Sequence, residues 1–148
     1  MRVVALLLLV LVAVPGCASK ESPAPSQPAV PVPLADPLVP LSGTQWVLVD
    51  VGGTAMNAAR TTLSFDGGPK VSGNGGCNTY SGGVRNQSGT ILFGPIQTTR
   101  KACAAPIMAQ ETRYFDVLVG TRGLEVDGNA LYFLDITSSR TAHFTKLP

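Results

Sequence analysis

Cysteine and histidine residues carry the most distinctive chemistry that this 148-residue chain could perform. Cys77 and Cys103 suit a disulfide, which would close a segment of about 25 residues and contribute about 3 kcal/mol in the chain-entropy model. The alternative is a nucleophilic Cys77, with Asn78 beside it and His143, the only histidine, as the base. A nucleophilic thiol needs a helix N-terminus or a base to activate it, whereas Cys77 lies in a glycine-rich stretch. We therefore favour the disulfide.

Glu111 is a second candidate, because its expected position conflicts with its charge. Residues 106–118 have helical spacing, and Glu111 lies four positions from both Ile107 and Phe115, on the face that should be buried. A buried carboxylate is costly unless it accepts hydrogen bonds. We expect it to accept backbone N–H groups from the glycine-rich stretch at residues 73–78. The alternative is a lone catalytic carboxylate or an anchor for a ligand.

Other kinds of site find little support in the sequence. Residues 73–78 match neither the dinucleotide fingerprint nor the P-loop, and their glycines more simply supply positive φ angles. A single histidine and scattered acidic residues predict no metal site, no cofactor and no acid–base pair. The formal charge is +2, or +1 without Arg2, and there is no basic block, so we expect no nucleic-acid partner. These features predict that the protein is not an enzyme.

Residues 1–16 have the pattern of a bacterial signal peptide. Arg2 precedes an unbroken apolar run that is too short for a permanent membrane span. The run ends in Val-Pro-Gly-Cys at residues 14–17, which is typical of a lipoprotein whose mature chain begins at Cys17. We expect a lipid on the Cys17 sulfur to anchor the chain in the cell envelope, where disulfides are permitted. Ala18 favours an outer membrane, facing the periplasm, if the cell has two membranes, and otherwise the anchor lies on the outer face of the plasma membrane.

The remaining chain divides into a tether and a domain. Proline recurs every two to four residues through most of residues 17–40, which predicts an extended spacer behind the lipidated cysteine. Residues 41–148 are enough for one domain. Their apolar residues mostly alternate, and Asp-Gly at 127–128 favours a hairpin. With a helix at about residues 106–119, the expected fold is α+β and mainly antiparallel β, as a strongly curved sheet or open barrel closed by that helix.

Four blocks of the domain resemble a known family. They are Gly-Thr-Gln-Trp-Val-Leu at 43–48, residues 71–82 with Gly-Cys-Asn at their centre, Thr-Thr-Arg-Lys-Ala-Cys at 98–103, and Glu111 with Tyr114 and Leu118. In these blocks residues 41–148 resemble the META domain, the family of the heat-shock lipoprotein HslJ. The resemblance implies a compact β-rich fold with a helix, a shared Cys77–Cys103 bridge and a role in stress tolerance, with no catalytic residue or cofactor. The family-motif residues to which we assign structural roles are Trp46, Gly73, Asn78, Arg100 and Glu111.

Three functions follow as hypotheses. The first is a non-catalytic, envelope-anchored domain that supports stress tolerance by binding an unknown envelope protein or ligand. The second is an inhibitor of a wall-degrading hydrolase such as lysozyme, which would insert residues 80–85 into a cleft as a loop. The third is an enzyme that uses Cys77 or Glu111.

Overall fold

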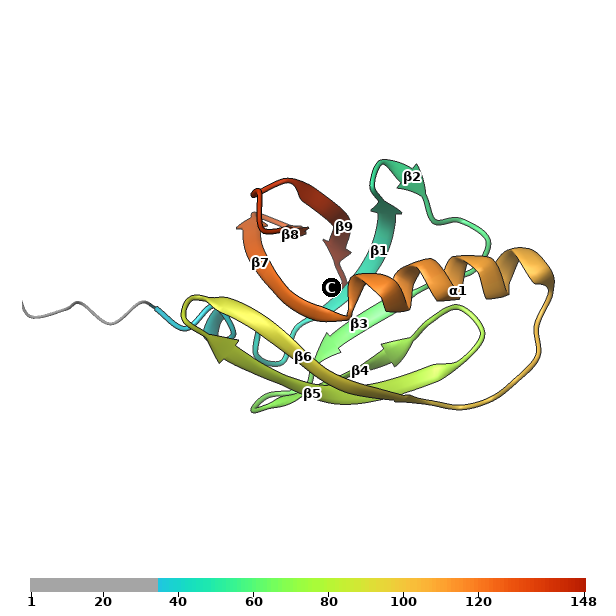
Figure 1. Cartoon of the computed structure of the whole chain (residues 1–148), viewed down its shortest axis with the longest axis horizontal. Coiled ribbons are helices and arrows are strands. Elements are labelled where there is room, and N and C mark those ends of the chain that lie inside the picture. The colour runs from blue at the N-terminus through green and yellow to red at the C-terminus, as the bar shows by residue number, and fades with distance from the viewer. Residues whose placement is uncertain (1–34) are drawn as a thin grey trace, which may run out of the picture. The chain divides into compact units, whose positions relative to one another are not determined.

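The structure, a computed structural model, describes residues 35–148 (Figure 1). They belong to a compact unit, Pro33–Pro148, which has a hydrophobic core of its own, as an independently folding domain requires. No helix in these residues is long and apolar enough to cross a membrane. The elements in chain order are η1 (Val39–Leu41), β1 (Gln45–Val51), β2 (Thr54–Ala55), β3 (Thr62–Phe65), β4 (Lys70–Asn74), β5 (Thr79–Gln87), β6 (Thr90–Thr98), α1 (Ala105–Val117), β7 (Gly120–Asp127), β8 (Ala130–Leu134) and β9 (Arg140–Lys146).

The nine strands of this region form one antiparallel sheet that curves into a ring (Figure 1). Their order is β2-β1-β3-β4-β5-β6-β7-β8-β9, and β9 also pairs with β1, which closes the ring. Strands β3 and β8 alternate between buried and partly buried residues, because one face of each points into the ring. The expected fold class, α+β and mainly antiparallel β with one closing helix, is confirmed.

Helix α1 begins and ends within two residues of the bounds that its sequence predicts. Pro106 lies in the first turn, where its missing N–H is not needed. After the helix, Gly120 adopts a φ of +81°, a conformation that favours glycine and lets the chain turn into β7. The buried face differs slightly from the expected one, because Ile107 and Phe115 are only partly buried. The buried positions of the helix are Gln110, Glu111, Tyr114 and Val117.

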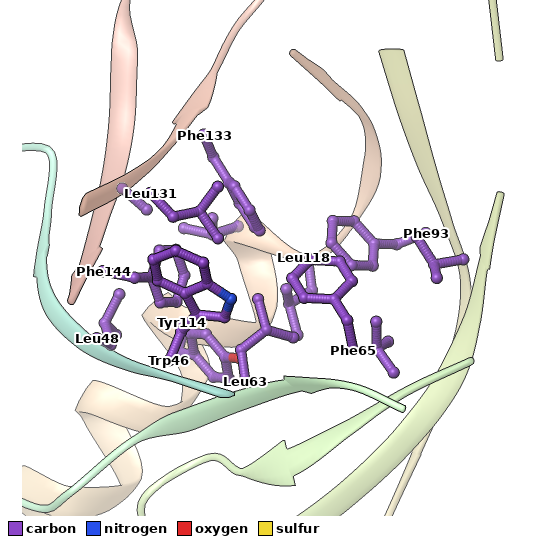
Figure 2. Packing of buried hydrophobic residues seen from close by; sticks show 14 of the residues in the cluster. Trp46, Leu48, Leu63, Phe65, Phe93, Tyr114, Leu118, Leu131, Phe133 and Phe144 are labelled. Atoms are coloured by element: carbon purple, nitrogen blue, oxygen red, sulfur yellow. The ribbon is translucent and has the colours of Figure 1, made fainter. Parts of the chain in front are cut away.

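The core lies inside the ring and combines aliphatic side chains with several large aromatic ones (Figure 2). Trp46 from β1, Tyr114 from α1 and Phe133 from β8 are among its largest fully buried side chains. The rings of Phe133 and Phe144 lie 4.9 Å apart between centroids, and Phe93 packs against Phe133 at 5.5 Å. Burial of each such side chain contributes roughly 1.5–3 kcal/mol. The core therefore joins the helix to strands from both halves of the ring.

The structure corrects the expectation for residues 80–85. They do not form an insertable loop but lie within β5, which pairs with β4 on one side and β6 on the other. Tyr80 and Val84 point into the core, and Gly82 and Gly83 between them hide the alternation from a reading of the sequence. Because this segment is held in the sheet, the hydrolase-inhibitor hypothesis loses the loop on which it depended.

The start of the domain also lies earlier than residue 41. Leu41 is buried at the end of η1, and Leu38 packs against the same core. The last few residues of the expected tether therefore belong to the folded domain. Cys17 and the rest of the signal and tether segments lie outside the described residues.

Candidate binding site

Glu111 holds the glycine-rich loop to the helix. Its Oε2 accepts hydrogen bonds from the backbone N–H groups of Cys77 at 3.0 Å and Asn78 at 2.6 Å. Its Oε1 accepts a third from Nδ2 of Asn78 at 2.7 Å. These are the backbone contacts that the sequence argument expects for a buried carboxylate. Both oxygens of the Glu111 carboxylate accept hydrogen bonds, so the carboxylate fixes the glycine-rich loop to α1. We call this set of contacts the Glu111 clamp.

Asn78 extends the clamp to the connection between β6 and α1. Its Oδ1 accepts hydrogen bonds from the backbone N–H of Lys101 at 2.7 Å and from the Thr99 hydroxyl at 2.9 Å. A disulfide between Cys77 and Cys103 joins the same two segments covalently. The loop, the connection and the helix are therefore fixed to one another by one buried network.

Two glycines of the loop are required for close packing more than for positive φ. A Cβ atom on Gly73 would lie 2.1 Å from the carbonyl oxygen of Thr62. One on Gly75 would lie 2.7 Å from the Phe115 ring and 2.9 Å from Oε2 of Glu111. Only Gly76 of this stretch has a positive φ, +122°. The glycines thus allow the loop to approach both β3 and the helix.

Trp46 and Arg100, to which the sequence also assigns structural roles, differ in burial and in hydrogen bonding. Trp46 is buried in the core, and its indole N–H donates to the Thr44 hydroxyl at 2.7 Å. Arg100 is exposed, and its side chain has no hydrogen bond or ion pair within residues 35–148. The structural role expected for Arg100 is therefore not visible, because the connection is held by Thr99 and Lys101 instead.

Gln110 is a buried polar residue that the sequence analysis missed. Its Oε1 accepts from the backbone N–H of Ala58 at 2.8 Å, and its Nε2 donates to the Ala59 carbonyl at 2.6 Å and the Thr61 hydroxyl at 3.0 Å. Gln110 therefore holds the chain before β3 against the helix as Glu111 holds the loop after β4. Its position next to Glu111, on the helix face expected to be buried, could have indicated that Gln110 is buried too.

The Cys77, Asn78 and His143 trio is not assembled. Nδ1 of His143 lies 3.3 Å from Oδ2 of Asp50, and the imidazole stacks on the Tyr132 ring. His143 therefore takes its partners from strands β1 and β8. Across the part of the chain that the structure describes, no three His, Cys, Asp or Glu side chains are grouped to hold a metal ion.

A groove of about 830 Å³ lies beside β6, and we call it the seam groove. It arises because β6 forks away from β7. Pairing with β7 ends at Phe93, and from there to Thr98 β6 pairs with β5 alone. The end of α1 and the turn after it lie on the other side of the groove. Its main apolar lining residues are Val84, Phe93, Ile96, Phe115, Leu118 and Val119.

The chemistry of the seam groove is that of a site for an apolar group. Arg85 is the only charged side chain among the residues that line it. Val119 remains 66% exposed, although it is an apolar residue at the groove. A volume within the range of small-molecule sites, with apolar walls and few polar groups, is typical of ligand pockets.

A second cavity of about 420 Å³ adjoins the seam groove, since both are lined by Pro69, Val84 and Arg85. It lies where the described chain begins, and Asp36 and Leu38 contribute to it. Its polar lining side chains include Asp36, Ser42 and Asn86. Arg85 therefore lies where the two cavities meet.

The family model of the META domain matches residues 39–147. The chain belongs to the META domain family. In this META domain the Gly-Cys-Asn block, the block that ends at Cys103 and the helix block meet at the Glu111 network. No curated protein matches the chain.

Two solved structures have the same fold. An NMR structure of a protein from Burkholderia xenovorans is 26% identical with a TM-score of 0.58, and the match covers 82% of this chain and 94% of that chain. A second NMR structure is 21% identical with a TM-score of 0.57, and it covers 72% of this chain and 91% of that one. The META domain described above therefore accounts for nearly the full length of both.

Proposed function

We propose that this chain is an envelope-anchored lipoprotein whose META domain binds an aliphatic chain in the seam groove and has no catalytic role. The observation that carries the proposal is the apolar lining of that groove, in which Arg85 is the only charged side chain. Aliphatic chains gain about 0.8 kcal/mol for each methylene that they bury. Phe93 and Leu118 are held rigidly by the core, so the groove is formed before a ligand arrives.

The membrane anchor in this proposal is the lipid on Cys17. The signal-peptide pattern of residues 1–16 supports it, and an anchored domain would meet amphiphiles that leave the bilayer. Cys17→Ser is expected to move the protein from the membrane fraction to the soluble fraction of cells that express it. Mass spectrometry of the wild-type N-terminus should find a lipidated cysteine, and an unmodified Cys17 would contradict this part of the proposal.

A role in stress tolerance completes the proposal, and the motif resemblance to the heat-shock lipoprotein family motivates it. Heat disorders membranes and releases amphiphiles, and a tethered binding domain would sequester them in the envelope. A strain that lacks the gene should lose viability at elevated temperature and regain it with the wild-type chain. If a variant that cannot bind in the groove, such as Val119→Glu, is expressed at the wild-type level and restores viability fully, stress tolerance does not depend on binding.

The direct test of binding uses Pro33–Pro148 and an uncharged ligand, 1-decanol, followed by amide chemical shifts in NMR spectra. We expect shifts that saturate and cluster around Ile96 and Val119. Val119→Glu places a charge at the groove and should abolish them, since Val119 is exposed and the fold does not depend on it. Ile136→Glu is the matched control, because Ile136 is 99% exposed and lines no cavity described above. Shifts that are absent, or that survive Val119→Glu, would refute the proposal.

A further inference from the structure

We propose that the natural ligand of the seam groove is a fatty acid, whose carboxylate binds the guanidinium of Arg85 while its chain fills the groove. This inference rests on the proposed function, because it assumes that the groove takes an aliphatic chain. It adds the chemical class of the head group and the residue that selects it.

Arg85 shares an available charge with Arg60, Arg100 and Arg113, but of these four only Arg85 lines the seam groove. Arg140 forms an ion pair with Glu125 at 2.6 Å. Arg122 donates to the carbonyl oxygens of Val117 and Asp116 at the end of α1. Arg85 is exposed and has no ion pair with any carboxylate of residues 35–148. Its guanidinium is therefore not engaged by a carboxylate of these residues, although Asp36 lines the adjoining cavity with it.

The place of Arg85 in β5 matches the two halves of an amphiphile. Val84, the preceding residue, is buried and lines the groove, and it pairs with the buried Phe93 across the two strands. As the next residue of the strand, Arg85 points to the face opposite Val84 and lines the groove at its exposed edge. A chain that lies on Val84 and Phe93 and leaves the groove at this edge would place its head group beside the Arg85 side chain.

The adjoining cavity favours a compact, singly charged head group. Asp36 lines that cavity with Arg85, and one of its carboxylate oxygens already accepts the backbone N–H of Leu38. A negative charge on Asp36 would repel any anionic head group that extended into the cavity, and a doubly charged phosphate more strongly than a carboxylate. A carboxylate matches the planar fork of a guanidinium and needs little additional space.

Two quantitative expectations follow. Each methylene added to a short chain should tighten binding about fourfold until the groove is filled. The carboxylate should add about threefold over an uncharged alcohol of equal length, because an ion pair with the exposed Arg85 is partly screened by solvent. This preference should shrink as ionic strength rises.

The experiment measures the dissociation constants of decanoate, 1-decanol and decyl phosphate for Pro33–Pro148 by calorimetry. Decanoate should bind about threefold more tightly than 1-decanol, and Arg85→Gln should make the two equal. Arg60→Gln is the matched control, because Arg60 is exposed, lines neither cavity and loses the same charge. Circular dichroism spectra would establish that both variants fold.

The outcomes separate the inference from the proposed function. If 1-decanol and decanoate bind equally well to the wild-type domain, the assignment of the head group and of Arg85 is overturned while the groove proposal stands. If decyl phosphate binds more tightly than decanoate, a phosphate-bearing lipid replaces the fatty acid. If no ligand binds, the proposed function itself fails.

Discussion

Replacing Glu111 with glutamine removes one charge from the buried network and changes almost no volume. The carboxylate offers two acceptor oxygens to three donors, which are the N–H groups of Cys77 and Asn78 and the Asn78 Nδ2 group. A glutamine side chain has a carbonyl oxygen that accepts and an NH2 group that donates. The NH2 group would therefore face at least one of the three N–H donors, and that hydrogen bond would be lost. Asn78 cannot invert its amide to compensate, because its Oδ1 is held by Lys101 and Thr99.

The expected cost of Glu111→Gln follows from this count. A lost hydrogen bond to a charged group costs about 1.5–3 kcal/mol, and the two that remain become weaker, so the total is about 2–4 kcal/mol. For a domain of this size, that corresponds to a fall in Tm of roughly 8–16 °C. Thermal unfolding of Pro33–Pro148, followed by far-ultraviolet circular dichroism with the disulfide intact, measures it.

Glu125→Gln provides the matched control for this measurement. Glu125 undergoes the same chemical change but lies on the surface, where its ion pair with Arg140 contributes little to stability. Its Tm should therefore stay close to that of the wild type. If Glu111→Gln lowered Tm no further than Glu125→Gln does, the clamp would not be structural and Glu111 would have to be reconsidered as a functional carboxylate.

Two further predictions concern buried tyrosines and a glycine. Burial raises the pKa of both Tyr80 and Tyr114, whose hydroxyls are hydrogen bonded to each other, above the usual value of about 10. The unfolded chain therefore releases these protons first, so stability should fall as pH rises above about 10, and urea unfolding should show a shallower fall in Tyr114→Phe. A wild-type stability that stays level from pH 9 to pH 11 would contradict this reasoning. Gly73→Ala should cost at least about 2 kcal/mol because its Cβ would overlap the Thr62 carbonyl. Gly83→Ala should unfold at nearly the wild-type urea concentration, because its Cβ would lie 3.8 Å from the Pro69 carbonyl oxygen, an ordinary contact. Equal midpoints for the two alanine variants would disprove the packing argument.

Much of the fold was predictable because its causes are local. Alternation of apolar residues predicted strands such as β3 and β8, and proline followed by helical spacing predicted α1. The Glu111 contacts were predictable for another reason: a carboxylate on a buried helix face needs donors, and a glycine-rich loop can present them. Gln110 obeys the same rule and could have been found by applying it one residue earlier.

The tertiary structure alone decided where β5 runs and where the seam groove opens. Gly82 and Gly83 carry no side-chain pattern, so β5 is defined by its pairing with β4 and β6 and by the irregular register near Val84. The groove exists because β6 stops pairing with β7 at Phe93, a relation between segments that are far apart in the chain. Sequence periodicity indicates which face of one element is buried. A cavity, in contrast, forms where several elements do not pack fully against one another, which no single segment of sequence specifies. The sequence by itself therefore determined the class of fold and the Glu111 clamp, and the packing of the ring determined the candidate binding site.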